Sequence, residues 1–284
     1  MTPAGLPRDL DEARRAGGPR WPADAVARVR DLLVTRHGGT VTVVACDSNA
    51  GIGDQPGDII RQPARVTGTS AAKVPLMEVL AAGAAPVIVV NTLGCALDGP
   101  GAEIVAGIED CVRSTGHHPV ITGSDETNVA TGQTSVGVTV IGVVDEASLR
   151  LGLAREGDLV AVVGVPMDGV EVPYDESDAL VVTPRDVVAL AARPDVAREI
   201  LPVGSRGVRH EAGALARTAG LAFDEVGSSV AMTRSAGSST CVLVACDPGR
   251  LDELATLVAQ PVTVVGRLVA VVAQPPNART AASG

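Results

Sequence analysis

Residues 119–144 have the sequence PVITGSDETNVATGQTSVGVTVIGVV, two apolar runs on either side of a polar loop. The first run predicts a short strand, and the second, Ser135–Val144, predicts a long strand because β-branched residues dominate it. The loop GSDETN at 123–128 begins where a strand ends, and α/β proteins bind ligands at such strand ends. Its adjacent carboxylates, Asp125 and Glu126, suit a metal ion, while a polar turn explains them equally well.

The sequence around this segment alternates between patterns typical of strands and of helices. In the first half, strands are predicted at Thr40–Ala45, Val87–Val90 and Pro119–Thr122, and helices at Thr69–Ala82, with Ser70 able to cap it, and Gly101–Ser114. In the second half, strands are predicted at Leu159–Val165, Glu199–Val203, Ala222–Val226, Thr240–Ala245 and Pro261–Val272, and helices at Pro184–Ala192, Val208–Ala219 and Pro248–Ala259. The fold class is therefore α+β with two domains.

The two ends of the chain look peripheral to these domains. We predict an N-terminal helical extension over residues 1–38, because Pro22 suits a helix start and the apolar residues of Ala23–Thr35 fall on one helical face. The small polar tail 275–284 is predicted to be disordered. The domains then cover 39–146 and 147–274.

Composition excludes several classes of function. The 284 residues include only three aromatic ones, Trp21, Tyr174 and Phe223, and carry a net charge of −10, which argues against a nucleic-acid partner. The polar N-terminal segment does not resemble a signal peptide. The longest uncharged run, Val79–Leu97, is broken by Gly and Pro, so we expect a cytoplasmic protein without a membrane partner. The five cysteines show no C-x-x-C spacing, which indicates reduced thiols.

Two further loops are candidates for chemistry. The segment CDSNAGIGDQPGD at 46–58 combines Gly51 and Gly53 with acids that could hold Mg²⁺ between phosphate oxygens, although a solvated surface turn is the simpler interpretation. The loop PVGSRGVR at 202–209 precedes a predicted helix, whose N-terminus could bind an anion. The lysine of GTSAAK at 68–73 lacks the second glycine of a P-loop, which disfavours a P-loop kinase.

Taken in order, several segments resemble the aminoimidazole-ribotide synthetase-like superfamily of ATP-binding proteins. They are ACDSNAGIGDQPGD, KVPLMEVLAAGAAP, ITGSDETNVATGQTSVGVTVIG and REGDLVAVVGVP. Within the superfamily, the GSDETN segment with Gln133, PVGSRGVRHEAGALA and SAGSSTCVLVA are most similar to α-ribazole kinases of cobalamin salvage. The resemblance covers about residues 40–272. It implies a two-domain fold in which the N-terminal domains of a homodimer form a β-barrel, with ATP bound between the two halves of the dimer.

The resemblance also implies roles for individual residues. Asp47 and Asp54 would be catalytic, with Asp47 orienting either the acceptor hydroxyl or a bridging metal ion. Metal ligands would be Asp47, Asp54, Glu78, Asp125 and Glu126, of which Asp125 is an added acid relative to the family pattern. ATP would contact Ser48, Asn49, Gly51, Gly53, Gly123, Ser124 and Thr127, and the acceptor would contact Asn128, Gln133, Ser205 and Arg206.

These features predict transfer of a phosphoryl group from MgATP to the 5′-hydroxyl of α-ribazole, a nucleoside. Two alternatives remain at this stage. One is another ATP-dependent reaction of the superfamily, such as a thiamine-monophosphate kinase or a ligase-like step. An anionic acceptor would require basic residues in the pocket, so the positions of Arg206 and Arg209 relative to the pocket distinguish this alternative. The other alternative is a nucleotide-binding sensor without catalysis.

Overall fold

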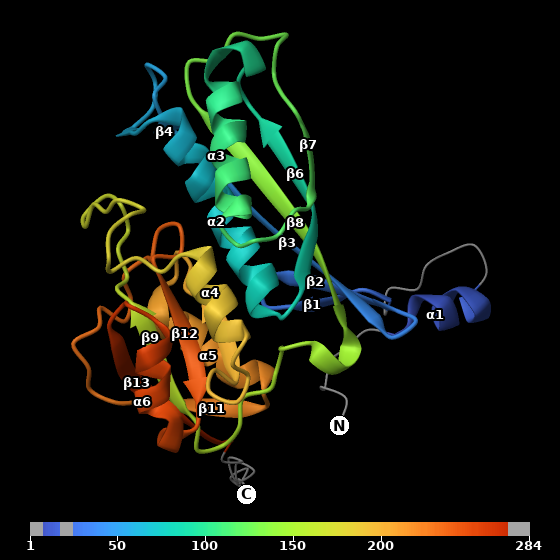
Figure 1. Ribbon diagram of the computed structural model, residues 1–284, viewed down its shortest axis with the longest axis vertical. Coiled ribbons are helices and arrows are strands. Elements are labelled where there is room, and N and C mark those ends of the chain that lie inside the picture. Colours follow the sequence, from blue (N-terminus) through green and yellow to red (C-terminus); the bar gives the residue numbers. More distant parts are fainter. Residues whose placement is uncertain (1–7, 18–24, 272–284) are drawn as a thin grey trace, which may run out of the picture.

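The computed structural model describes residues 8–17 and 25–271 of the chain, which form an N-terminal and a C-terminal lobe (Figure 1). The N-terminal lobe comprises α1 (Leu10–Gly17), β1 (Ala27–Val29), β2 (Leu32–His37), β3 (Thr40–Ala50), β4 (Ile52–Gly53), β5 (Ile60–Arg61), α2 (Ala64–Ala81), β6 (Ala85–Leu93), a π-helical turn (Leu97–Gly101), α3 (Ala102–Arg113), β7 (Val120–Ser124) and β8 (Ser135–Asp145). The C-terminal lobe comprises β9 (Leu159–Gly164), α4 (Pro184–Ala191), β10 (Glu199–Pro202), α5 (Gly207–Thr218), β11 (Leu221–Glu225), β12 (Cys241–Cys246), α6 (Leu251–Leu257) and β13 (Val262–Ala270). This α+β order confirms the predicted class.

The N-terminal lobe is a mixed sheet with helices on one face. Its strand order is β1-β2-β3-β8-β6-β7, and all neighbours are antiparallel except the parallel pair β6 and β7. Helix α2 packs on β3 and β8 and also against α3, α4 and β10. Because α2 is enclosed by both lobes, 13 of its 18 residues are buried. Close contact between α2 and α3 requires Gly68 and Gly107, since a Cβ at either position would collide with the other helix's backbone.

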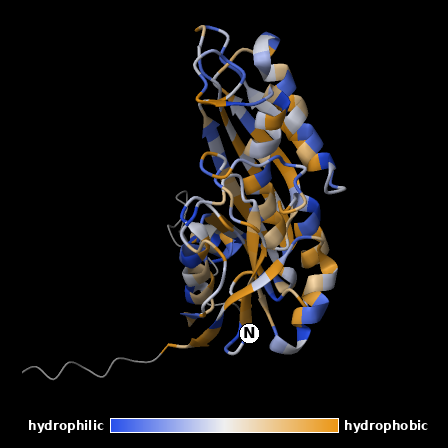
Figure 2. Ribbon diagram, turned by 90° about the vertical axis from the view of Figure 1, so that its left-hand side faces the viewer, coloured by the Kyte–Doolittle hydropathy of each residue, from blue (hydrophilic) through white to orange (hydrophobic). Residues whose placement is uncertain are grey.

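The C-terminal lobe is an antiparallel sheet of order β10-β12-β9-β13-β11. Every residue of β12 is buried, which explains its continuous apolar sequence CVLVAC. Helix α5 packs against β10, β11 and β12, while α4 packs against β10 and α6. Figure 2 shows that hydrophobic residues gather along the strands in the middle of the molecule. The five cysteines are free thiols, as predicted. In the described part of the chain, no helix has the length and hydropathy that a membrane span requires.

The other face of the N-terminal sheet carries a row of apolar side chains. The strand registers place five residues side by side on adjacent strands: Leu33, Val44, Ile141, Ile88 and Val120. Leu33, Ile88 and Val120 are 46%, 38% and 71% exposed. This row lies opposite α2, because the neighbouring residue Gly142 faces Val79 of α2. We call this surface the open sheet face.

The helix predicted over residues 23–35 is wrong within the described residues. Residues 27–29 and 32–37 instead form the hairpin β1–β2, which extends the N-terminal sheet along β3. The side chains of Leu32 and Val34 are buried and that of Leu33 is exposed, a two-residue period. Helix α1 is the one α-helix in the described part of the predicted extension. Pairing with β3 therefore outweighs the helical spacing of these residues.

Smaller differences concern element boundaries. Strand β3 continues through Cys46–Ala50, which we predicted to belong to a loop, because these residues stay paired with β8. Helix α2 begins at Ala64, five residues before the predicted start, so Ser70 lies inside it and is not its cap. The predicted tail 275–284 and the start of the predicted extension lie outside the described residues.

Candidate active site

A cleft of about 810 Å³ lies between the two lobes. Its N-terminal wall is formed by the end of β3 and the segment that leads into α2. Its opposite wall is formed by residues 166–182, which we call the strap, and by Gly237 and Ser238 before β12. Four residues that we predicted for the site line this cleft: Asp47, Ser48, Asn49 and Ser205.

The alternation of strand β3 places Asp47 in the cleft. Val43 and Ala45 are buried beneath α2, and Asp47 follows two residues later on the same face of the strand. Its backbone pairs with Val138 of β8, so its position is set by the sheet. Burial raises the pKa of the Asp47 carboxyl, and the nearby Asp31 raises it further. A carboxylate with a raised pKa is a better acceptor for the proton of a substrate hydroxyl.

Glu78 of α2 and Glu211 of α5 lie at the junction of the lobes. Both line a small cavity of about 30 Å³ together with Arg30 and Asp31. Burial raises the pKa of Glu78 to about 8, and Asp31, Asp47 and Glu211 add to this shift. Burial likewise raises the pKa of Glu211 to about 7. Acids held in this way lose their protons readily when a cation arrives.

The predicted set of five metal ligands is not assembled within one chain. Among residues 8–17 and 25–271, no group of three His, Cys, Asp or Glu side chains is arranged to hold a metal ion. Asp47 and Glu78 lie close enough for their charges to interact, whereas the other three predicted ligands, Asp54, Asp125 and Glu126, lie elsewhere. Magnesium is commonly held by one or two carboxylates together with substrate phosphates. Asp47, which lines the cleft, could therefore contact Mg²⁺ that arrives there with a nucleotide, whereas Glu78 lines the separate small cavity.

The glycine-rich loop and the GSDETN segment meet at the far end of the N-terminal lobe. We call residues 51–58 and 123–134 the distal loops. Gly51 N donates to Thr134 O at 2.8 Å, Gly57 N donates to Gly132 O at 2.7 Å, and the Gln133 amide donates to Gly57 O at 2.9 Å. None of the cleft-lining residues belongs to 123–134. The distal loops thus bring together many predicted residues; segment 123–134 does not line the cleft that Asp47 lines, whereas Ile52 of segment 51–58 does.

Acids of the distal loops are bonded to backbone N–H groups. Asp125 accepts from Leu97 N at 2.9 Å, and Glu126 accepts from Asn128 N and Val129 N at 2.7 and 3.0 Å. Asp58 accepts from Thr134 N at 2.7 Å, from the Thr134 hydroxyl at 2.6 Å and from Gln55 N at 2.9 Å. Burial raises the pKa of Asp58, but these hydrogen bonds outweigh it and lower the pKa below its usual value. Asp58 therefore holds the loop together.

Other predicted residues of these loops occupy exposed or tightly packed positions. Asp54, Thr127 and Asn128 are exposed, and Gly123 and Ser124 end strand β7 beside β6. Gly53 has a φ of +159°, and a Cβ there would lie 2.7 Å from the Asp58 carboxylate. Its lack of a side chain thus serves the packing of the loop itself.

The basic residues expected for an anionic substrate do not line the cleft. Arg206 is exposed and lies 3.4 Å from the ring of His210. Arg209 forms a two-bond ion pair with Glu225 at 2.6 and 2.7 Å. Among the residues that line the cleft, Arg61 is the one cation, and its guanidinium donates to the backbone carbonyls of residues 54–56. Four carboxylates share the lining: Asp47, Asp168, Asp175 and Glu176.

This chain is similar in structure to known proteins, whereas comparisons of its sequence find no match. No protein-family model matches the chain, and no curated protein sequence matches it. Thiamine-monophosphate kinase from Aquifex aeolicus has a similar structure, with a TM-score of 0.61 and 16% identity over 85% of this chain and 89% of that chain. The chain has an aminoimidazole-ribotide synthetase-like fold.

Two further structures share this fold. PurL from Thermotoga maritima, solved with AMPPCP, matches with a TM-score of 0.56 and 18% identity over 86% of this chain, which spans 42% of that one. The hydrogenase maturation protein HypE, solved with ATP, matches with a TM-score of 0.56 and 15% identity over 80% of this chain and 77% of that one. The expected α+β fold is thereby confirmed, with mixed and antiparallel sheets, while the β-barrel formed by the N-terminal domains of a dimer stays a prediction.

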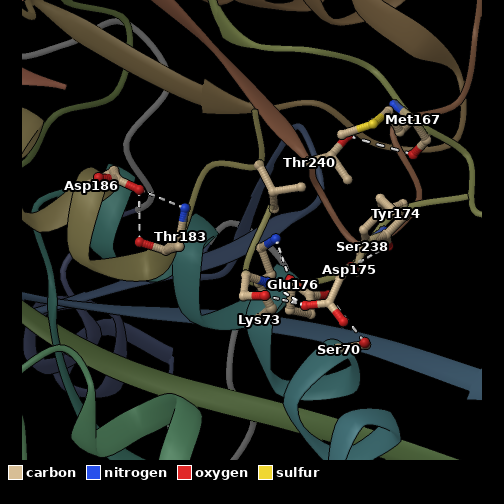
Figure 3. Close-up of polar contacts among 12 residues, drawn as sticks. Ser70, Lys73, Met167, Tyr174, Asp175, Glu176, Thr183, Asp186, Ser238 and Thr240 are labelled. Atoms are coloured by element: carbon tan, nitrogen blue, oxygen red, sulfur yellow. Dashed lines mark hydrogen bonds and ion pairs between the residues drawn. The ribbon is translucent and has the colours of Figure 1, made fainter. Parts of the chain in front are cut away.

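A polar network between the lobes escaped the sequence analysis (Figure 3). Lys73 of α2 is 1% exposed, and its Nζ donates to Glu176 Oε2 of the strap at 2.8 Å. Ser70 and Ser238 donate to Glu176 Oε1 at 3.1 and 2.8 Å. The signal in the sequence was the lysine within the stretch SAAKVPLM of α2, whose other residues are small or apolar. Its partner lies 103 residues away, beyond the reach of local patterns.

Proposed function

We propose that this chain is an ATP-dependent kinase that phosphorylates the 5′-hydroxyl of α-ribazole. The aminoimidazole-ribotide synthetase-like fold supports the use of ATP, because structures that share it were solved with ATP or AMPPCP. The observation that carries the choice of acceptor is the charge of the cleft. Its lining contains four carboxylates, of which Glu176 is paired with Lys73 and Asp168 lies 3.9 Å from Arg234, and one cation, Arg61, that is already bonded to backbone carbonyls. Such a cleft favours a neutral nucleoside over a phosphorylated acceptor.

Asp47 is the residue we assign to the acceptor hydroxyl. It lines the cleft, is fixed by its strand, and its raised pKa suits acceptance of the hydroxyl proton during transfer. Glu78 lies behind it and would join Asp47 in holding Mg²⁺. The bound ion would neutralise charge on the phosphate oxygens. Ser48, Asn49 and Ser205 line the same cleft and provide hydrogen-bond partners for substrate hydroxyls.

We further propose that a second copy of the chain completes the site. Segment 123–134 carries the predicted ATP contacts Gly123, Ser124 and Thr127, yet none of its residues lines the cleft that Asp47 lines on the same chain. The open sheet face exposes a continuous apolar row across five strands, which a second N-terminal sheet would cover. Such a homodimer would bring the distal loops of one subunit to the cleft of its partner.

The direct test is ADP release by the purified protein with MgATP, with and without α-ribazole. We expect α-ribazole to stimulate ADP release with one ADP per phosphorylated nucleoside, and thiamine monophosphate to have no effect. Stimulation by thiamine monophosphate alone would favour the second candidate, a thiamine-monophosphate kinase, which the structural match to such enzymes supports. ATP binding without ADP release under any condition would indicate a sensor.

A complementation experiment tests the shared site. Asp47→Asn and the double variant Asp125→Asn/Glu126→Gln should each be inactive. In a heterodimer of the two, one of the two sites would have all its residues, so co-expression should restore about a quarter of the wild-type activity in a random mixture. Co-expression of two copies of Asp47→Asn with different tags is the matched control. Absence of any recovery in a mixture proven to contain heterodimers would contradict the shared site.

A further inference from the structure

We propose that the ring of Tyr174 is the surface on which the heteroaromatic base of the acceptor stacks. This inference rests on the proposed function and names the part of the cleft that recognises the base. Tyr174 is the one tyrosine among the three aromatic residues of the chain, and it lies on the strap where the strap lines the cleft.

The hydroxyl of Tyr174 is already engaged within the protein. Ser238 donates its hydroxyl proton to the Glu176 carboxylate at 2.8 Å, since a carboxylate can only accept. The Ser238 oxygen therefore accepts from the Tyr174 hydroxyl at 2.6 Å, and Ser238 N donates to the Tyr174 oxygen at 3.1 Å. With both roles of the hydroxyl filled, what Tyr174 offers a ligand is its ring, and rings recognise flat aromatic groups by stacking.

The ring is held in place before a ligand arrives. A Cβ at Gly237 would lie 3.1 Å from the Cε1 atom of Tyr174 and 2.9 Å from its hydroxyl oxygen, so the ring packs directly against glycine backbone. Gly237 belongs to the SAGSST segment at 235–240, which the sequence analysis noted without assigning a role. A ring fixed in advance loses little conformational entropy on binding.

The Lys73–Glu176 ion pair fixes the same part of the strap to helix α2. Lys73 and Ser70 of α2 donate hydrogen bonds to the Glu176 carboxylate, which also accepts one from Ser238. Ser238 in turn accepts a hydrogen bond from Tyr174. Buried ion pairs contribute little net stability, so their value lies in the geometry that they specify. Here that geometry sets Tyr174 relative to the N-terminal wall of the cleft, where Asp47 would meet the acceptor hydroxyl.

The test measures binding by calorimetry without ATP or Mg²⁺, with α-ribazole and with methyl riboside, which lacks the base. Wild-type protein should bind α-ribazole more tightly than methyl riboside. Tyr174→Phe keeps the ring and should retain this preference, whereas Tyr174→Leu should weaken α-ribazole binding about 10-fold or more and leave methyl riboside unchanged. The KM for ATP should stay within about 2-fold in both variants, because the substitutions remove no ATP contact.

The outcomes separate this inference from the proposed function. Unchanged α-ribazole affinity in Tyr174→Leu would overturn the stacking surface, even if the kinase activity is confirmed. Binding of α-ribazole that depends on the ring of Tyr174, in a protein that releases no ADP, would uphold the stacking surface and refute the kinase. Equal losses for α-ribazole and methyl riboside in Tyr174→Leu would indicate a general collapse of the strap and would also overturn the proposal.

Discussion

The acids of the cleft and the acids of the distal loops are the same residue types in opposite electrostatic situations. In the distal loops, Asp58, Asp125 and Glu126 accept hydrogen bonds from backbone N–H groups. At the cleft, burial and neighbouring acids raise the pKa values of Asp47 and Glu78. The comparison teaches that a carboxylate satisfied by amides organises its loop, whereas a buried carboxylate among other acids is arranged for a cation or a proton.

The largest expected effect tests the cleft side of this comparison. Asp47→Asn should lower kcat by about 10²–10⁴-fold, because it removes the proton acceptor and one metal ligand. The midpoint of thermal unfolding should stay unchanged or rise, since a carboxyl with a raised pKa does not stabilise the fold at neutral pH. The exposed Asp252→Asn on α6 is the matched control. Near-wild-type turnover of Asp47→Asn would contradict our site.

The next largest expected effect tests the role of the acids in the distal loops. Asp58→Asn should reduce the free energy of unfolding by about 1–3 kcal/mol, because charge-assisted hydrogen bonds from Thr134 and Gln55 are lost or weakened. Folding lowers the pKa of Asp58, so its ionised carboxylate stabilises the fold at pH values above the pKa that Asp58 has in the unfolded chain. This stabilisation disappears as the pH falls through the pKa that Asp58 has in the folded chain. Urea unfolding of the wild type and of Asp58→Asn at pH 7 and pH 3 measures the loss of unfolding free energy and its dependence on pH. Exposed Asp54→Asn in the same loop should change stability by no more than about 0.5 kcal/mol.

A third prediction concerns the pH dependence of stability. With pKa values of about 8 for Glu78 and about 7 for Glu211, these acids keep their protons in the folded chain at pH values where the unfolded chain releases them. Stability should therefore fall as the pH rises from about 4.5 towards 8. Glu78→Gln should flatten this decline and add about 1–3 kcal/mol at pH 8. A steeper decline in Glu78→Gln than in the wild type would contradict the raised pKa.

The smallest effect concerns the junction between the distal loops. Gln133→Ala removes the hydrogen bond to Gly57 O, a neutral interaction worth about 0.5–1.5 kcal/mol. We expect the KM for the nucleoside to rise a few-fold and more than the KM for ATP, as measured by steady-state kinetics. An unchanged KM for both substrates would show that Gln133 only joins the two loops.

Much of the fold was predictable because local patterns report local burial. The apolar run of Ser135–Val144 and the helical spacing of Gly101–Ser114 correspond to β8 and α3 within one or two residues. The structure of segment 27–37 could not be predicted, because its apolar residues fit a helix and a hairpin equally well. The hairpin is stabilised by the pairing of β2 with β3 and by the hydrogen bond from the Arg30 side chain to Thr218 in the other lobe.

The sequence by itself determined the α+β class, most strands and helices, and the acidic character of the loops, because side-chain period and composition act over a few residues. Tertiary structure decided which of those acids meet. It brought Asp47 and Glu211 close enough to Glu78 for their charges to raise its pKa, kept Asp125 and Glu126 out of the cleft lining, and paired Lys73 with Glu176 across 103 residues. These outcomes depend on how two lobes pack around α2, and packing between distant segments leaves no period in the sequence.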